Sequence, residues 1–159
     1  ILRHSGAPRG SIYHHFPEGK AQLVEAATRY AGDYIAAGLA TALAGEDPPT
    51  AVRTFTAWWL TLLSGSDFAA GCPVVAATLE GDRAPGARDA AGGAFSRWEG
   101  LIAEALEARG LDAGRARSLA TLTIAAVEGA VVLARAQRSK EPLRRVAAEL
   151  EALLTEASA

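Results

Sequence analysis

The sequence predicts an all-α protein. Alanine, which has the highest intrinsic helix propensity, is abundant along the whole chain, and runs of β-branched residues are few. Clusters of glycine and proline divide the 159 residues into segments that are mostly of helical length. None of these segments alternates apolar and polar residues over a sustained stretch, as a half-buried strand does. Half of the residues are hydrophobic, which is enough for one globular domain with a sizeable core.

The longest expected helix runs from Lys20 to Leu43. Its apolar stripe is formed at helical spacing by Leu23, Ala27, Tyr30, Tyr34 and Ala37. The helices expected after it cover residues 49–63, 73–80, 85–109, 113–138 and 141–156. Asp112 is the expected N-cap of the helix 113–138, and Gly110 is the expected C′ residue that ends the helix before it.

Three of these helices have distinct apolar patterns. The helix 85–109 has one apolar face, formed by Phe95, Trp98, Ile102 and Leu106. The helix 113–138 is apolar nearly all round, which predicts burial on several sides. The last helix has a stripe formed by Leu143, Val146, Leu150, Leu153 and Leu154.

Bulk properties restrict the class of protein. The net charge is −2, so any DNA contact must come from a local basic patch. A single cysteine excludes an internal disulfide framework and fits a reducing cytosol. We see no leader and no apolar run of the roughly 18 residues that span a membrane, so we expect a cytoplasmic protein without a membrane partner. The sequence contains no methionine, so we expect Ile1 not to be a natural start and the chain to be a fragment.

The first twenty residues form a local basic region. All three histidines lie here, together with Arg3, Arg9 and Lys20, against a single acid, Glu18. The layout is a helix end (1–4), a glycine-containing turn and a short helix (8–16), which is the pattern of a helix-turn-helix. Small and polar residues at the start of the short helix would let its N-terminus approach a phosphate backbone or base edges closely.

The segment 6–20 resembles the recognition helix of the tetracycline-repressor (TetR) family. The matching residues, at the family's spacing, are Gly6, Gly10, Ser11, Tyr13, His15, Phe16 and Lys20. Pro8 departs from the pattern, because the family usually has a capping serine or threonine there. The resemblance implies a TetR-like fold: a partial helix-turn-helix DNA-binding domain in residues 1–19, without its first helix and most of its second, and a helical ligand-binding and dimerisation bundle in residues 20–159.

The resemblance also implies roles for individual residues. Arg9 would read base edges, where an arginine pairs with guanine through two hydrogen bonds. The other expected DNA contacts are Gly10, Ser11, Tyr13, His14 and Lys20. Ile12 and Phe16 would pack inward, and His15 is either a structural residue or a DNA contact. The alternative is a solvated basic helix in another kind of α-protein.

Aromatic residues suggest a ligand cavity between the middle helices. The candidate lining residues are Phe55, Trp58, Trp59, Leu62, Phe68, Cys72, Leu79, Phe95, Trp98, Ile102, Val127, Glu128 and Val131. Each aromatic residue has the alternative of being an ordinary core residue. Trp58 and Trp59 are about 100° apart on a helix, so they cannot both face one point. We expect Trp59 to face inward with Phe55 and Leu62, while Trp58 remains open.

Two polar positions stand out in this region. The segment Gly71-Cys72-Pro73 resembles a stretch in a TetR subgroup that includes drug-efflux regulators. Cys72 is either a small wall residue near the pocket or, before a helix N-terminus, a reactive thiol, although the chain has no second cysteine to resolve it. Glu128 is an acid inside an apolar run, and it either anchors a ligand amine or hydroxyl or pairs with Arg135 or Arg97.

The last two helices predict a homodimer. Small residues on the helix 113–138 allow close helix approach, and two such helices from each chain would form a four-helix bundle. A dimer is what a helix-turn-helix needs to read a palindromic operator. Internal packing within a monomer is the alternative.

The predicted function is a ligand-responsive DNA-binding transcriptional repressor, which a small, largely apolar or aromatic effector releases from its operator. We find no metal-ligand spacing, no phosphate loop and no nucleophile with a base, so we expect no enzyme, no catalytic residues, no metal and no cofactor. The alternative is an all-helical carrier of hydrophobic ligands, or an enzyme, with a vestigial helix-turn-helix.

Overall fold

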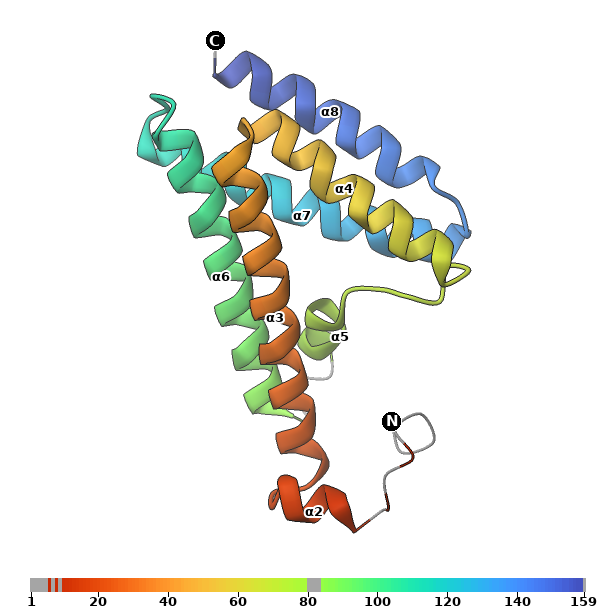
Figure 1. The fold of residues 1–159 in the computed structure, drawn as a ribbon. Coiled ribbons are helices and arrows are strands. Elements are labelled where there is room, and N and C mark those ends of the chain that lie inside the picture. Colours follow the sequence, from red (N-terminus) through yellow and green to blue (C-terminus); the bar gives the residue numbers. More distant parts are fainter. Residues whose placement is uncertain (1–5, 7, 9, 80–83, 159) are drawn as a thin grey trace. The chain divides into compact units, whose positions relative to one another are not determined.

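The computed structural model describes residues 6, 8, 10–79 and 84–158 (Figure 1). The described residues contain helices and no strand, which confirms the all-α prediction. The helices are α2 (Ser11–His15), α3 (Lys20–Gly45), α4 (Pro48–Gly65), α5 (Pro73–Leu79), α6 (Pro85–Glu107), α7 (Ala113–Gln137) and α8 (Glu141–Ala157).

The ends of most helices lie close to the predicted positions, because the expected capping residues act there. Asp112 caps α7 by accepting hydrogen bonds from the backbone N–H groups of Gly114 and Arg115. Gly110, just beyond α6, has a φ of +93°, which glycine adopts at little cost. Asp47 caps α4 through the N–H of Thr50, and this hydrogen bonding lowers the pKa of its carboxyl.

The short N-terminal helix was predicted too long. It begins at Ser11, not at Pro8, and ends at His15. The carbonyl of Pro8 accepts hydrogen bonds from both the N–H and the hydroxyl of Ser11, so the residues before α2 form a turn.

The chain forms two compact units. The first comprises residues up to Asp33 together with Pro73–Ala94. In this unit α3 and α6 come very close, because a Cβ added to Gly32 would lie 2.7 Å from the Cβ of Ala94. A Cβ added to Gly86 would likewise meet the carboxylate of Glu25. Small residues are therefore required where these two helices approach each other.

The second unit comprises Tyr34–Cys72 and Phe95–Ala159. Its centre is the packing of α8 against α4 and α7, and α4 also contacts α7. The largest fully buried side chains of this unit are Trp59, Leu63, Trp98, Leu106, Leu119, Val127, Val131, Leu143 and Leu154. The apolar faces predicted for the helices 85–109 and 141–156 supply several of them.

The apolar stripe predicted on α3 is wrong. Tyr30 and Tyr34 are 74% and 60% exposed, and Ala27 and Ala37 are also exposed. The buried positions are instead Thr28, Gly32, Ile35, Ala36 and Leu39. Both sets have helical spacing, and at Gly32 the close approach of α6 at Ala94 leaves no room for a tyrosine ring.

The helix α7 is buried on one side only. Ile124, Val127 and Val131 are buried, whereas Leu122, Val132 and Leu133 are about half exposed. Contrary to our expectation, α7 is long and apolar enough to cross a membrane by length and composition. Half of its most apolar stretch is buried inside the protein, as in the core helix of a helical bundle.

The close approach of α3 and α6 predicts opposite effects for the same substitution at two glycines. Gly32→Ala should lower the free energy of unfolding by about 1–3 kcal/mol, because its methyl group meets Ala94 and forces the helices apart. Gly93→Ala, at an exposed position of α6 with open space around it, should raise the free energy of unfolding by about 0.5–1 kcal/mol. Urea unfolding at one fixed protein concentration measures both, and equal effects would refute the close packing.

Candidate functional site

The segment around α2 has the local structure expected of a short recognition helix. Gly6 has a φ of +66°, in the turn before the helix, and Gly19 has a φ of +72°, in the turn that leads into α3. The helix α2 has five residues, and none of them is buried. Ile12 and Phe16 are the half-buried apolar residues at this end, in line with the prediction that they pack inward.

The side chains predicted to contact DNA are accessible where the structure describes them. Tyr13 is 70% exposed, and Gly10, His14 and Lys20 are exposed as well. His14 and His15 are adjacent, and their rings meet edge to face at 5.0 Å between centroids. The hydroxyl of Ser11 donates to the carbonyl of Pro8, which leaves its oxygen as an acceptor. Arg9, the predicted base-reading residue, lies outside the described residues.

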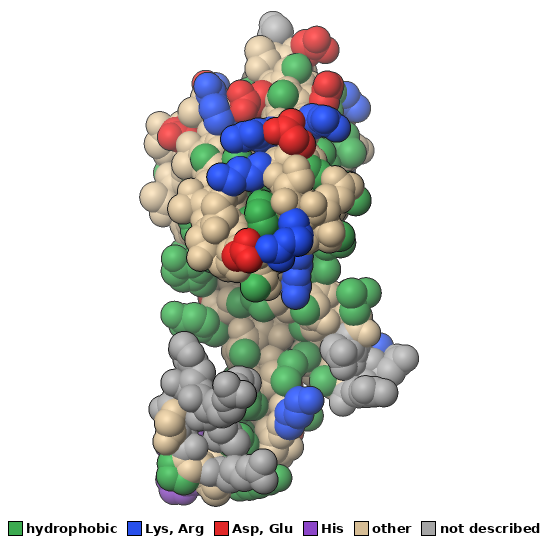
Figure 2. Space-filling view, turned by 90° about the vertical axis from the view of Figure 1, so that its right-hand side faces the viewer, with side chains coloured by type: hydrophobic (Ala, Val, Ile, Leu, Met, Phe, Trp, Pro, Cys, Tyr) green, Lys and Arg blue, Asp and Glu red, His purple; other side chains and the backbone are tan. Residues whose placement is uncertain are grey.

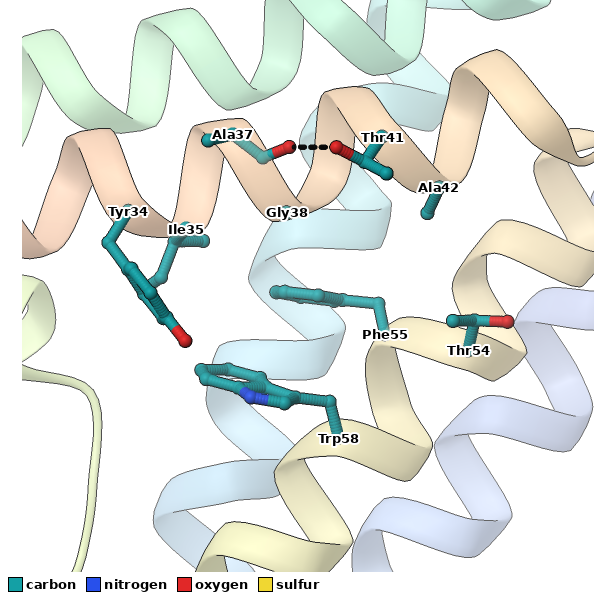
Figure 3. Close-up of a pocket in the computed structure, with 9 residues that line it drawn as sticks. All are labelled: Tyr34, Ile35, Ala37, Gly38, Thr41, Ala42, Thr54, Phe55 and Trp58. Atoms are coloured by element: carbon teal, nitrogen blue, oxygen red, sulfur yellow. Dashed lines mark hydrogen bonds between the residues drawn. The ribbon is translucent and has the colours of Figure 1, made fainter.

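A groove of about 420 Å³ lies between the C-terminal part of α3 and the helix α4 (Figure 3). Its lining residues, none of them charged, are Tyr34, Ile35, Ala37, Gly38, Thr41, Ala42, Thr54, Phe55 and Trp58. The rings of Phe55 and Trp58 are nearly parallel, at 17° and 5.9 Å between centroids. The ring of Tyr34 approaches Trp58 from α3, at 6.4 Å.

The two threonine hydroxyls of this groove are engaged, which leaves the Tyr34 hydroxyl and the Trp58 indole N–H as its side-chain donors. The hydroxyl of Thr41 donates to the carbonyl of Ala37, and the hydroxyl of Thr54 donates to the carboxylate of Glu46. The groove therefore presents flat aromatic faces and few free donors. Such a surface suits an uncharged, flat, apolar molecule.

The structure brings only two of the predicted cavity residues, Phe55 and Trp58, into this groove. Trp59 faces inward as expected, but as a fully buried core residue, and its partner Leu62 is 38% exposed, which corrects that part of the prediction. Leu79 is 84% exposed at the end of α5, so it is not a buried wall residue. Phe68 and Phe95 are half-buried, and the fully or almost fully buried members of the set are Trp98, Ile102, Val127 and Val131.

Sequence reasoning missed the α3 side of the groove. Tyr34 was placed in a core stripe because its spacing from Tyr30 is helical. The signal that distinguishes the two roles is Gly32, a residue without a side chain inside a long helix, which marks the side of close helix packing.

The segment that joins α4 to α5, residues 66–72, lies along the C-terminal half of α7, and we call it the strap. Asp67 forms an ion pair with Arg138 at 2.7 Å. The side chain of Arg135 lies over Gly71, where an added Cβ would be 2.9 Å from its Nη1. The thiol of Cys72 donates a hydrogen bond to the carboxyl of Glu128. The strap therefore covers α7 from Arg138 back to Glu128.

Glu128 is the buried acid of this unit. Only 7% of the surface of this residue is exposed, and its Oε2 has no hydrogen-bond partner. Burial raises the pKa of this carboxyl to about 7, and the smaller effect of the Cys72 thiol opposes the rise. The structure shows no ion pair between Glu128 and Arg135 or Arg97, so the predicted pairing is wrong.

An apolar surface remains on α7 and α8. The exposed positions of α7 include a set without polar side chains at helical spacing: Leu122, Ala125, Gly129, Val132 and Leu133. Beside them a shallow groove of about 380 Å³ lies between α7 and α8, lined mainly by apolar side chains. In the view of Figure 2, basic and acidic side chains are interspersed on the upper part of the surface. On α8, Arg144 forms an ion pair with Glu141.

Comparison with known proteins defines the class to which this fold belongs. A crystal structure of a TetR regulatory protein from Rhodobacter sphaeroides superposes with a TM-score of 0.83 and 25% identity, covering 94% of this chain and 83% of that one. A TetR transcriptional regulator from Legionella pneumophila superposes with a TM-score of 0.82, also at 25% identity, covering 96% of this chain and 83% of that one. The fold is that of TetR transcriptional regulators.

Sequence comparison gives the more particular assignment. Residues 48–149 match the family described as transcriptional regulator LmrA/YxaF-like, C-terminal domain. The HTH-type regulator Rv0196 of Mycobacterium tuberculosis is 41% identical over 97% of this chain and 81% of its own length. The HTH-type regulator LmrA of Bacillus subtilis is 30% identical over 97% of this chain and 83% of its own length. The chain belongs to the TetR family of transcriptional regulators, with an LmrA/YxaF-like C-terminal domain.

The raised pKa of Glu128 predicts a pH-dependent stability. Between the ordinary value of 4.5 and the folded-state value of about 7 the folded chain holds more protons than the unfolded chain, so stability falls as pH rises through this window. The full penalty, roughly 3 kcal/mol, is present above pH 7. Glu128→Gln should therefore stabilise the protein more at pH 8 than at pH 5. Urea unfolding at both values measures the difference, and a gain that is independent of pH would contradict the buried, ionisable carboxyl.

Proposed function

We propose that this chain is the greater part of a ligand-responsive transcriptional repressor. In this proposal a homodimer binds a palindromic operator through an N-terminal helix-turn-helix domain, of which residues 1–19 form a part. Residues 20–159 bind the effector and form the dimer. A small, largely apolar or aromatic effector releases the dimer from DNA. The observation that supports this function best is the uncharged aromatic groove on α3, because α3 begins at Lys20, directly after the predicted recognition helix.

The proposed mechanism is a shift between two states of the dimer. An effector between Tyr34 and the stacked pair of Phe55 and Trp58 would contact α3 and α4 together. It releases DNA only to the extent that it binds the released state more tightly than the DNA-bound state. Movement of α3 would then be passed to its first turn, at the DNA-reading end.

The proposed dimer interface is the apolar surface of α7 and α8. Leu122, Val132 and Leu133 are about half exposed in the single chain, and a second copy would cover them.

We further propose a cytoplasmic location, and membership in the subgroup with the Gly71-Cys72-Pro73 segment that includes drug-efflux regulators. The names of the relatives, all HTH-type regulators, support the DNA-binding part of the proposal.

The DNA-reading role predicts a selective loss of operator binding. A duplex selected from a random library by the full-length gene product serves as the operator. Tyr13→Ala should weaken its binding at least about tenfold, because each good contact contributes roughly 1–3 kcal/mol. Tyr30→Ala, which removes an equally exposed tyrosine outside α2, should leave the affinity unchanged. Fluorescence anisotropy at physiological salt measures both, and a full-length product that prefers no duplex over random DNA would contradict the repressor function.

The sensing role predicts a selective loss of ligand binding. With 2-naphthol as a neutral aromatic probe, Trp58→Ala should weaken binding at least about tenfold, because it removes the stacking surface of the groove. Leu62→Ala removes an exposed apolar side chain of the same helix outside the groove, and it should have no effect. Titration calorimetry gives the affinities, while anisotropy tests release of the selected duplex. Equal effects of Trp58→Ala and Tyr13→Ala in both assays would contradict the separation of roles.

A further inference from the structure

Glu128 differs from every other buried polar residue in the described part of the chain. The others are the threonines Thr28, Thr56 and Thr123, and each hydroxyl donates to a backbone carbonyl one turn earlier in its helix. Those hydroxyls are satisfied by the helices themselves. Glu128 is the ionisable member of the set, and its Oε2 has no partner; the other buried side-chain atom without a partner is Nε1 of Trp59, a neutral donor. A buried polar atom of this kind calls for a missing partner, because leaving it unpaired costs free energy.

The surroundings of the carboxyl restrict what that partner is. The contacting titratable group is the Cys72 thiol, a weak donor, and no charged side chain contributes to the raised pKa. The neighbours of Glu128 on the buried face of α7 are Ile124, Val127 and Val131, which are all apolar. A carboxylate in an apolar wall attracts a cation with an apolar body.

An organic cation fits these residues better than a metal ion. The described residues contain no group of three His, Cys, Asp or Glu side chains that could hold a metal. One carboxylate oxygen offers one strong hydrogen bond, which matches a single ammonium group.

The strap supplies a route to the carboxyl. It covers α7 between Arg138 and Glu128, and its contacts with α7 are the exposed ion pair of Asp67, the Arg135 side chain over Gly71 and the weak hydrogen bond of the Cys72 thiol. Asp67 and Phe68 both have positive φ, at 51° and 60°, a conformation that costs free energy for residues other than glycine. Opening the strap would break an exposed ion pair and a weak thiol hydrogen bond, and it would release the two residues with positive φ.

We propose that Glu128, beneath the strap, binds the ammonium group of a small hydrophobic amine. This cation site is separate from the groove between α3 and α4, because neither Glu128 nor Cys72 lines that groove. The carboxylate accepts a hydrogen bond from the ammonium group through Oε2, and the thiol of Cys72 stays on the carboxyl. The chain then has two ligand sites of different chemistry, one for an uncharged aromatic molecule and one for a cation.

The test compares benzylamine with benzyl alcohol, two probes of the same size that differ in charge. Titration calorimetry of the dimeric chain at pH 8 should give an affinity for benzylamine at least about tenfold higher, because an ion pair with a buried carboxylate is stronger than a neutral hydrogen bond. Glu128→Gln should abolish that preference. Glu104→Gln, at an exposed position of α6, and Trp58→Ala, in the groove between α3 and α4, should both retain it.

A pH series on the unmodified chain keeps the proposal testable if the variant fails to fold. Glu128 is a carboxylate above its pKa of about 7 and neutral below it, so the affinity for benzylamine should fall as pH drops from about 8 to 6. The affinity for benzyl alcohol should not change in this way.

Equal affinities for the two probes, or a preference for benzylamine that survives Glu128→Gln, would overturn the cation site. Neither outcome bears on the binding of 2-naphthol or on release of the operator, which test the proposed function. The two proposals can also separate in the other direction. If the protein prefers benzylamine through Glu128 but binds no operator, the cation site is supported and the repressor function is contradicted.

Discussion

The packing of α7 is the constraint on which the rest of this structure depends. One face of this helix is buried against α4 and α8, and it holds Ile124, Val127 and Val131 in the core. The same face contains Glu128, which the apolar neighbours make costly to ionise. The opposite face presents half-exposed leucine and valine side chains around Ala125 and Gly129. The described part of the chain covers the first of these faces, and the second is the surface that we propose for a second copy.

This division explains how one short helical chain accommodates several tasks. The buried face of α7 and the strap enclose the carboxyl, and the exposed face is the one proposed to bind a second copy. The aromatic groove is built elsewhere, from α3 and α4, so binding there does not compete with the surface proposed for dimerisation. In the proposed repressor, effector binding and dimerisation therefore use different surfaces of the same unit.

Much of the fold could be predicted from local patterns, because helix ends are determined by nearby residues. Asp112 and Gly110 marked the start of α7 and the end of α6, and the structure confirms both. Helical spacing alone could not decide which face of α3 is buried. Tyr34 and Ile35 are adjacent, and the choice between them depends on how closely another helix approaches, which is a tertiary property. The predicted stripe followed the larger apolar side chains, whereas the close contact at Gly32 selects the smaller ones.

The candidate sites show the same limit. A dense motif in residues 6–20 predicted the proposed DNA-reading end without any structure, because that motif consists of residues close together in the sequence. The aromatic groove combines residues more than ten positions apart on two helices, so no local pattern could reveal Tyr34 as a partner of Trp58. Glu128 was recognised as an unusual acid, but its contact is Cys72, from the strap, and neither of the arginines that the sequence suggested.

The oligomeric state tests the central role of α7 most directly. Sedimentation velocity at micromolar concentration should show a dimer for the unmodified chain and for Ala57→Glu, an exposed position of α4. Ala125→Glu places a charge in the middle of the exposed apolar face of α7, and it should give a monomer with unchanged helical content, because burying two like charges at a symmetric interface is costly. A monomeric unmodified chain, or an Ala125→Glu variant that remains dimeric, would contradict the account.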